Sequence, residues 1–149
     1  MGFFGHIKSR NLVNWHHLPL ALGPEPGTDE FALNDGCIDL DGNGVPIMWY
    51  TRDFNGKKAR EHIPVRGDDD MIKWERIKDV PPLTLENHGG PEFNPGWSDP
   101  IIFHENGESF MLISKCVTLD GRGVIPIYKA TDDTLLSWEY KGIFLDETG

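Results

Sequence analysis

Two aspartates occupy equivalent places in this 149-residue chain, and their carboxylates could act together on a substrate. Asp35 lies 39 residues before Trp74, and Asp99 lies 39 residues before Trp138. A carboxylate accepts hydrogen bonds from hydroxyl groups and exchanges protons, so two of them facing one space would suit a polar, uncharged substrate. Whether the two meet depends on the elements that carry them.

The residues that follow each aspartate read as a β-hairpin. An apolar run comes first, then a turn (Asp41-Gly42-Asn43-Gly44 or Glu105-Asn106-Gly107), and then a second apolar run. Asp-Gly and Asn-Gly between short β-rich runs predict hairpins, because glycine accepts the positive φ that the turn requires. Each aspartate is therefore expected at the start of the first strand of a repeated unit.

Three tryptophans end three copies of one short pattern. The steps between Trp15, Trp74 and Trp138 are 59 and 64 residues. The copies are Asn11-Leu12-Val13-Asn14-Trp15, Asp70-Met71-Ile72-Lys73-Trp74 and Thr134-Leu135-Leu136-Ser137-Trp138. Self-similarity at a period of about 50 residues or somewhat more is typical of propeller blades or solenoid units. We assign the three tryptophans to packing between blades; the alternative is chance recurrence of an L-x-x-W pattern.

The composition favours an all-β fold, since 17 glycines and 11 prolines suit a chain rich in turns. We predict a partial β-propeller of about two four-stranded blades plus the end of a third, divided into residues 1–15, 16–78 and 79–149. The first strands of propeller blades line the central channel, so Asp35 and Asp99 should face one cavity. A closed propeller typically has four to eight blades. We therefore expect the chain to be part of a larger protein.

Charge and ligand spacing argue against several classes of function. The formal net charge of −10 argues against nucleic acid as a partner, and no apolar run approaches the ~20 residues of a membrane span. Neither the six histidines nor Cys37 and Cys116 show a metal-ligand spacing, so no metal or cofactor is expected. A disulfide between the two cysteines stays open. The run Asp68-Asp69-Asp70 is expected to cap a turn.

Three parts of the chain resemble glycoside hydrolase family 32, the β-fructosidases. Gly5 to Leu22 resembles a W-G-H-x-x-S-x-D-L-x-x-W-x-x-L-P-x-A-L segment near the end of the family's first blade. Asn87-His88-Gly89-Gly90-Pro91 with Trp97-Ser98-Asp99-Pro100 resembles the stretch around its R-D-P motif, and Asp132 to Tyr140 resembles the segment before its Glu-Cys motif. The resemblance keeps the order of the motifs and runs nearly from end to end.

The resemblance implies a five-bladed propeller with a funnel-shaped pocket and a retaining glycosidase mechanism. In that mechanism one carboxylate attacks the anomeric carbon and a second protonates the leaving oxygen, with the two about 5 Å apart. A third carboxylate, that of R-D-P, binds the fructose hydroxyls and stabilises the transition state. By position this role falls on Asp99. The implied partner is a fructose-containing oligo- or polysaccharide such as sucrose, levan or inulin.

The chain departs from the family pattern in three ways. The N-D-P-N-G motif of the nucleophile and the Glu-Cys motif of the acid/base do not occur in these 149 residues, so the chain alone is expected to be inactive. Ser98 stands where the family has arginine, which removes a permanent cation beside Asp99. Asp35-Gly36-Cys37 replaces a Ser-Gly-Ser-like segment and adds a carboxylate to the pocket, so we expect altered specificity.

Each of these assignments has an alternative. Asp35, Trp97 and Ser98 are predicted to bind substrate, but packing between blades is the alternative for Trp97. Asp99 before Pro100 and Asp35 before Gly36 are also ordinary turn arrangements. At the level of function, the alternatives are an arabinosidase or xylosidase resembling glycoside hydrolase family 43, and a non-catalytic sugar-binding propeller. Oligomers or aggregates are expected through the exposed blade faces.

Overall fold

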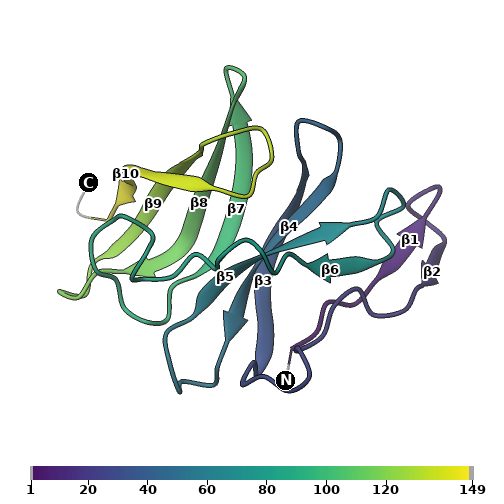
Figure 1. The fold of residues 1–149 in the computed structure, drawn as a ribbon, viewed down its shortest axis with the longest axis horizontal. Helices are drawn as coiled ribbons and strands as arrows, with labels where there is room; N and C mark the ends of the chain where they lie inside the picture. Colours follow the sequence, from purple (N-terminus) through teal and green to yellow (C-terminus); the bar gives the residue numbers. More distant parts are fainter. Residues whose placement is uncertain (1, 148–149) are drawn as a thin grey trace.

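The computed structural model describes residues 2–147, and these residues contain ten strands and no helix (Figure 1). A short hairpin comes first, formed by β1 (Ile7–Ser9) and β2 (Trp15–His17). The first four-stranded sheet contains β3 (Ala32–Leu40), β4 (Pro46–Asp53), β5 (Glu61–Gly67) and β6 (Trp74–Arg76). The second contains β7 (Ser98–Glu105), β8 (Glu108–Val117), β9 (Gly123–Ala130) and β10 (Trp138–Asp146). The all-β prediction with two four-stranded sheets is confirmed, whereas the division at residues 15/16 and 78/79 stays a prediction.

Both four-stranded sheets are antiparallel meanders that begin with the predicted hairpin. Gly44 and Gly107 lie in the β3–β4 and β7–β8 turns, each with a φ of 80° that a residue with a Cβ rarely adopts. The strands then follow in the order β3-β4-β5-β6 and β7-β8-β9-β10, so β6 and β10 are edge strands. The first strands, β3 and β7, contact each other where the two sheets meet (Figure 1).

One face of the first sheet packs on the second sheet. Ile47 and Trp49 of β4 belong to the same buried cluster as Met111, Ile113 and Tyr128 of the second sheet. The indole Nε1 of Trp49 donates a hydrogen bond of 2.8 Å to the backbone oxygen of Leu135 and so ties the sheets together. Alternate residues of a strand point to opposite faces, which leaves Met48 and Tyr50 for the other side.

The other face of the first sheet is covered by the N-terminal segment. Met48, Tyr50 and Val65 form a second cluster with Leu22, and Phe4 packs against it. The Phe4 and Tyr50 rings meet edge to face, with centroids 5.9 Å apart. Since both faces of β4 are covered, the strand is almost wholly buried and reads as a continuous apolar run.

The tryptophan repeat corresponds to a repeated turn. Leu12, Met71 and Leu135 each lie three residues before a tryptophan and have φ values of 59°, 54° and 58°. In the second copy, the Asp68 carboxylate accepts hydrogen bonds from the backbone nitrogens of Ile72 (2.7 Å) and Lys73 (3.1 Å), so the predicted cap is confirmed. The pattern found in the sequence therefore records a backbone conformation as well as an apolar side chain.

The tryptophans themselves differ in burial. Trp74 is buried in the cluster beneath the N-terminal segment. Trp138 packs edge to face on Trp49, with centroids 6.3 Å apart, at the interface of the sheets. The packing between blades predicted for Trp138 is confirmed, whereas that for Trp74 stays a prediction. Trp15 is 49% exposed, so the structure does not show it in such an interface.

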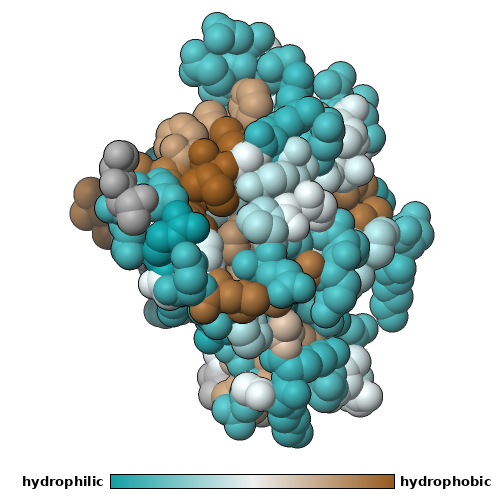
Figure 2. Space-filling model, turned by 90° about the vertical axis from the view of Figure 1, so that its left-hand side faces the viewer, coloured by the Kyte–Doolittle hydropathy of each residue, from teal (hydrophilic) through white to brown (hydrophobic). Residues whose placement is uncertain are grey.

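The second sheet carries exposed apolar side chains, among them Ile101, Phe144 and Leu145, and its β8 has half-buried ones at Phe110 and Leu112. Phe110 and Leu112 have the same spacing from Gly107 in the β7–β8 turn as Ile47 and Trp49 have from Gly44 in the β3–β4 turn. They therefore occupy the positions by which the first sheet packs on its neighbour. Figure 2 looks onto the side of β9 and β10 and shows hydrophobic residues gathered there.

Among residues 2–147 no helix of the length and apolarity of a membrane span occurs.

Candidate functional site at Asp99 and Asp35

The main chain of Asp99 is held from both sheets. Asp99 is the second residue of β7 and has a φ of 70°, an unusual value for a residue other than glycine. Its backbone nitrogen donates to the hydroxyl of Thr51 on β4 at 3.0 Å. Its backbone oxygen accepts from the hydroxyl of Ser114 on β8 at 3.1 Å. Two side chains from different sheets thus fix the peptide groups on either side of its Cα.

The carboxylate of Asp99, by contrast, is not engaged. The residue is half-buried, and within residues 2–147 its side chain has no hydrogen-bond or ion-pair partner. An acceptor with four lone-pair sites on a fixed backbone is suited to bind the hydroxyl groups of a ligand. The role that the sequence predicted for Asp99, binding of substrate hydroxyl groups, stays a prediction.

Asp35 is the extra residue of a β-bulge. The pairing of β3 with β4 shifts between Asn34, which pairs with Thr51, and Gly36, which pairs with Tyr50. A Cβ at Gly36 would lie 2.2 Å from the backbone oxygen of Trp49, so only glycine fits there. A bulge re-aims the side chain of the inserted residue, and Asp35 is exposed.

The structure brings the two aspartates to adjoining strands. Thr51 pairs with Asn34, the neighbour of Asp35, and its hydroxyl binds the backbone of Asp99. The two aspartates therefore lie on either side of one β4 residue. Neither lines any of the hollows described below, and the cavity predicted between them stays a prediction.

Trp97 and Ser98, which are predicted to bind substrate, are both buried, and their role stays a prediction. Each is 1% exposed. The Trp97 indole donates to the backbone oxygen of Arg60 at 2.8 Å, and its ring lies edge to face against His62 at 4.4 Å between centroids. Burial to this extent leaves no indole face for a sugar ring, so the alternative of packing between the sheets accounts for Trp97. The Ser98 side chain is likewise closed to a ligand.

Two buried histidines pack against Trp97, and one of them, His62, also contacts Thr51; the sequence assigned a role in the site to neither. The Nδ1 atom of His62 lies 3.2 Å from the Thr51 hydroxyl, and that of His88 lies 2.8 Å from the Tyr128 hydroxyl. Burial lowers the pKa of His62 to about 3, and it lowers the pKa of His88 as well. Both rings are therefore neutral at neutral pH. The apolar run Ile63-Pro64-Val65 that follows His62 in β5 was the one available sign of its burial.

The metal-ligating residue types are not grouped as a metal site. Among residues 2–147, no three His, Cys, Asp or Glu side chains are arranged to hold an ion. Cys37 and Cys116 are free thiols, which answers the question of their pairing. Burial raises the pKa of Cys37 to about 11 and that of Cys116 to about 12, so neither thiol is activated.

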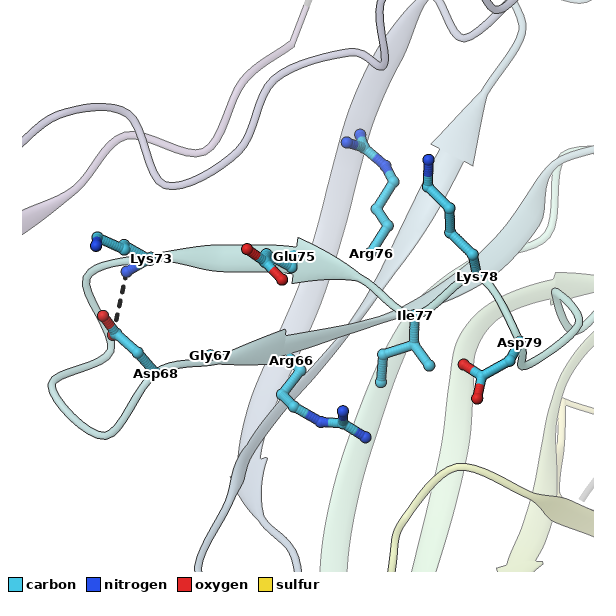
Figure 3. Close-up of a pocket in the computed structure, with 9 residues that line it drawn as sticks. All are labelled: Arg66, Gly67, Asp68, Lys73, Glu75, Arg76, Ile77, Lys78 and Asp79. Atoms are coloured by element: carbon cyan, nitrogen blue, oxygen red, sulfur yellow. Dashed lines mark hydrogen bonds between the residues drawn. The ribbon is translucent and has the colours of Figure 1, made fainter.

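A charged hollow of about 420 Å³ follows the β5–β6 hairpin (Figure 3). Seven charged side chains of both signs line it: Arg66, Asp68, Lys73, Glu75, Arg76, Lys78 and Asp79. Arg76 is already engaged with the Glu30 carboxylate at 2.8 Å, and in Figure 3 Arg66 projects to the opposite side of the hairpin. Mixed charges on an edge strand hinder pairing with another sheet. We therefore interpret this surface as edge protection.

A second hollow, of about 530 Å³, lies between the segment after β6 and the turn before β10. Trp49, Pro82 and Trp138 contribute to its wall. It lies where the two sheets meet, and neither candidate aspartate contributes to it. We therefore keep Asp99 on β7 and Asp35 on the adjoining strand β3 as the candidate site.

Comparison with known proteins identifies the family. The model described as the glycosyl hydrolases family 32 N-terminal domain matches residues 2–149. This chain belongs to glycosyl hydrolase family 32. The resemblance found in the sequence is confirmed, and the alternative of family 43 is set aside.

Relatives with assigned names cover most of this chain. Sucrose-6-phosphate hydrolase from Zymomonas mobilis is 46% identical over 115 residues, which are 74% of this chain and 21% of that protein. An insoluble β-fructofuranosidase isoenzyme from Arabidopsis thaliana is 30% identical over 135 residues, or 87% of this chain and 22% of that protein. The chain thus spans about a fifth of the length of the curated relatives it matches.

Solved structures confirm the fold. A fructofuranosidase from Schwanniomyces occidentalis, complexed with fructose, superposes with a TM-score of 0.73 at 19% identity, covering 95% of this chain and 28% of that one. Sucrose-6-phosphate hydrolase from Lactobacillus gasseri gives a TM-score of 0.72 at 23% identity, covering 93% of this chain and 27% of that one. The two sheets are therefore blades of a partial β-propeller.

Proposed function

We propose that this chain supplies part of the sugar site of an enzyme that hydrolyses β-fructosides such as sucrose, levan or inulin. The observation that carries the proposal is Asp99, whose carboxylate is unpartnered while its backbone is bonded to Thr51 and Ser114. Asp99 stands at the aspartate of the R-D-P motif in a chain of family 32. The names of the relatives, sucrose-6-phosphate hydrolase and β-fructofuranosidase, support the same substrate class.

In this proposal Asp99 binds fructose hydroxyl groups and stabilises the transition state. A retaining glycosidase passes through an oxocarbenium-like transition state between two carboxyl groups about 5 Å apart. Hydrogen bonds to ring hydroxyls that strengthen in that state lower the barrier by several kcal/mol. A carboxylate on a backbone that is already held in place suits this task, because it needs little reorganisation when charge develops in the transition state. Asp35 would contact a further hydroxyl group of the substrate.

The nucleophile and the acid/base are assigned to no residue of this chain. Neither the N-D-P-N-G motif nor a Glu-Cys pair occurs in its 149 residues. Incubation of the purified chain with sucrose should therefore release no fructose above the rate of a buffer blank. Robust release would show that other carboxylates of this chain perform the two steps, and the assignment of roles would be wrong.

Sugar binding can be tested on the chain itself. In 1H–15N NMR spectra, fructose should shift the amide resonances of Asp99 and Asp35, whereas xylose should not. Since NMR detects binding in the millimolar range, where the binding free energy is about −4 kcal/mol, a partial site suffices. Asp99→Asn should weaken the response, and Asp69→Asn, at an exposed position in the β5–β6 turn, is the matched control. Equal responses to both sugars, or none to either, would overturn the proposal.

A further inference from the structure

We propose that Thr51, oriented by the buried His62, positions Asp99 for its role in the sugar site. The inference rests on the proposed function for the meaning of Asp99, but its geometry is independent of any sugar. Thr51 and His62 are adjacent partners in the β4–β5 ladder, and both are fully buried. The Thr51 hydroxyl lies 3.0 Å from the Asp99 nitrogen and 3.2 Å from His62 Nδ1.

The direction of these hydrogen bonds follows from the number of protons available. The Asp99 N–H can only donate, so the Thr51 hydroxyl accepts there. Among residues 2–147 the only other hydrogen-bond partner of this hydroxyl is His62 Nδ1, so we assign its single proton to that bond, with His62 Nδ1 as the acceptor. The proton of the neutral imidazole then sits on Nε2, which has no hydrogen-bond partner among these residues. The order of donation is thus Asp99 N–H to Thr51 Oγ1, and Thr51 O–H to His62 Nδ1.

The surroundings of His62 and Thr51 favour this order of hydrogen-bond donation. His62 is 0% exposed, and burial together with the nearby His88 lowers its pKa, so the ring stays neutral. The Trp97 ring packs edge to face on the imidazole and limits its rotation. Thr51 is β-branched and therefore stiff at χ1. The hydroxyl consequently reaches Asp99 with a fixed position and a fixed acceptor lone pair.

Asp99 needs such support because its backbone conformation is unfavourable. At a φ of 70°, the Cβ of an L-residue approaches the backbone closely, and only glycine adopts this region freely. Ser98 and Pro100, on either side of Asp99, are buried and held in place. The backbone conformation of Asp99 between them therefore sets the direction in which its carboxylate points. The bond to Thr51 comes from the other sheet. The position of Asp99 therefore depends on how the two sheets pack.

The test uses NMR on the whole 149-residue chain with three variants. Thr51→Val keeps the shape of the side chain and removes the acceptor, Thr51→Ser keeps the hydroxyl, and Ser114→Ala removes the bond to the Asp99 oxygen instead. We expect Thr51→Val to accelerate hydrogen exchange of the Asp99 amide about tenfold, which corresponds to 1.4 kcal/mol. Thr51→Ser should restore most of the protection. Amides of β10, at the far edge of the second sheet, should not change.

A purely structural role would accelerate exchange throughout the chain in Thr51→Val, and that result would overturn the proposal. So would an Asp99 amide that exchanges at the wild-type rate in Thr51→Val. Should this variant fail to fold, the 15N shifts of His62 in the wild-type chain decide the matter. A protonated Nδ1 would contradict the inferred donor order, and an unprotonated Nδ1 supports it.

These measurements use no sugar and separate the two proposals. If fructose fails to shift the Asp99 amide in the wild-type chain while Thr51→Val still loses protection at Asp99, the proposed function fails and the positioning stands. If fructose shifts Asp99 equally in the wild type and in Thr51→Val, Thr51 does not position the site, whatever the function.

Discussion

Glu30 offers the sharpest test of what holds the first sheet together. Its side chain is 0% exposed, and both carboxylate oxygens are engaged. Oε1 accepts from the Tyr50 hydroxyl at 2.7 Å, and Oε2 accepts from the Glu25 backbone nitrogen at 2.6 Å and from Arg76 at 2.8 Å. The group joins the loop before β3 to β4 and β6. We expect Glu30→Gln to destabilise the fold strongly although the two side chains have nearly the same shape.

The expected magnitude follows from what the variant leaves behind. An amide at this position keeps one oxygen acceptor, and its NH₂ group would face either the Arg76 guanidinium and the Glu25 N–H or, when turned over, the Tyr50 hydroxyl and the Arg52 guanidinium. Either way it faces a cation that needs an acceptor. Arg76 would keep a largely buried charge without its counter-charge. Removing one partner of a buried ion pair costs about 3–5 kcal/mol. For a chain of this size, about 1 kcal/mol lowers Tm by roughly 2–4 °C, so a drop on the order of 10 °C is expected.

Urea unfolding followed by tryptophan fluorescence measures this difference in the free energy of unfolding. Glu108→Gln is the matched control, because Glu108 makes its ion pair with Lys129 while 50% exposed. An exposed pair contributes about 0–1 kcal/mol. If Glu30→Gln shifts the midpoint no more than Glu108→Gln, the buried network does not hold the loop on the sheet, and the reasoning is refuted.

Three further predictions follow from which side chains are buried and which are exposed. Because the pKa of His62 is lowered to about 3, the unfolded chain binds a proton between about pH 6.5 and 3 that the folded chain does not. The free energy of unfolding should therefore decrease as the pH is lowered from about 6.5 to 3, by up to about 1.4 kcal/mol per pH unit. The decrease should be less steep in His62→Gln, and equal slopes in the two proteins would contradict the prediction. Cys37 and Cys116, whose pKa values are raised, should react slowly with a thiol reagent at pH 8 and quickly in urea, and fast reaction of the folded chain would contradict their burial. Since Phe144 and Leu145 are 60% and 56% exposed, light scattering should show oligomers that a double substitution to lysine reduces; a strictly monomeric wild type would disprove this.

The hairpins could be predicted from the sequence because their determinants are local. Gly44 and Gly107 close turns within a few residues, and alternating apolar residues then fix which face of each strand is buried. The tryptophan repeat added the period of the units. The left-handed backbone at Leu12, Met71 and Leu135 could not be predicted from the residue types, since leucine and methionine disfavour this conformation.

The environment of the site could not be predicted because it depends on contacts between sheets. Asp99 and Thr51 are 48 residues apart, and Trp97 donates to Arg60 across 37 residues. No pattern in a single sequence links such pairs. Trp97 was assigned to substrate binding because tryptophan beside a candidate carboxylate suits sugar stacking. In the structure Trp97 is buried and packs edge to face on His62.

The loss of the family's arginine at position 98 can be understood from the same packing. Ser98 is buried between Trp97, which is packed on His62, and Asp99, which is bonded to Thr51. An arginine cation beside the carboxylate would orient it by charge and by hydrogen bonds. If Thr51 positions Asp99 as proposed, the support comes through the backbone, from a hydroxyl that a neutral imidazole holds in place. The carboxylate then needs no permanent positive charge beside it, and its acceptor sites stay open to the hydroxyl groups of a ligand.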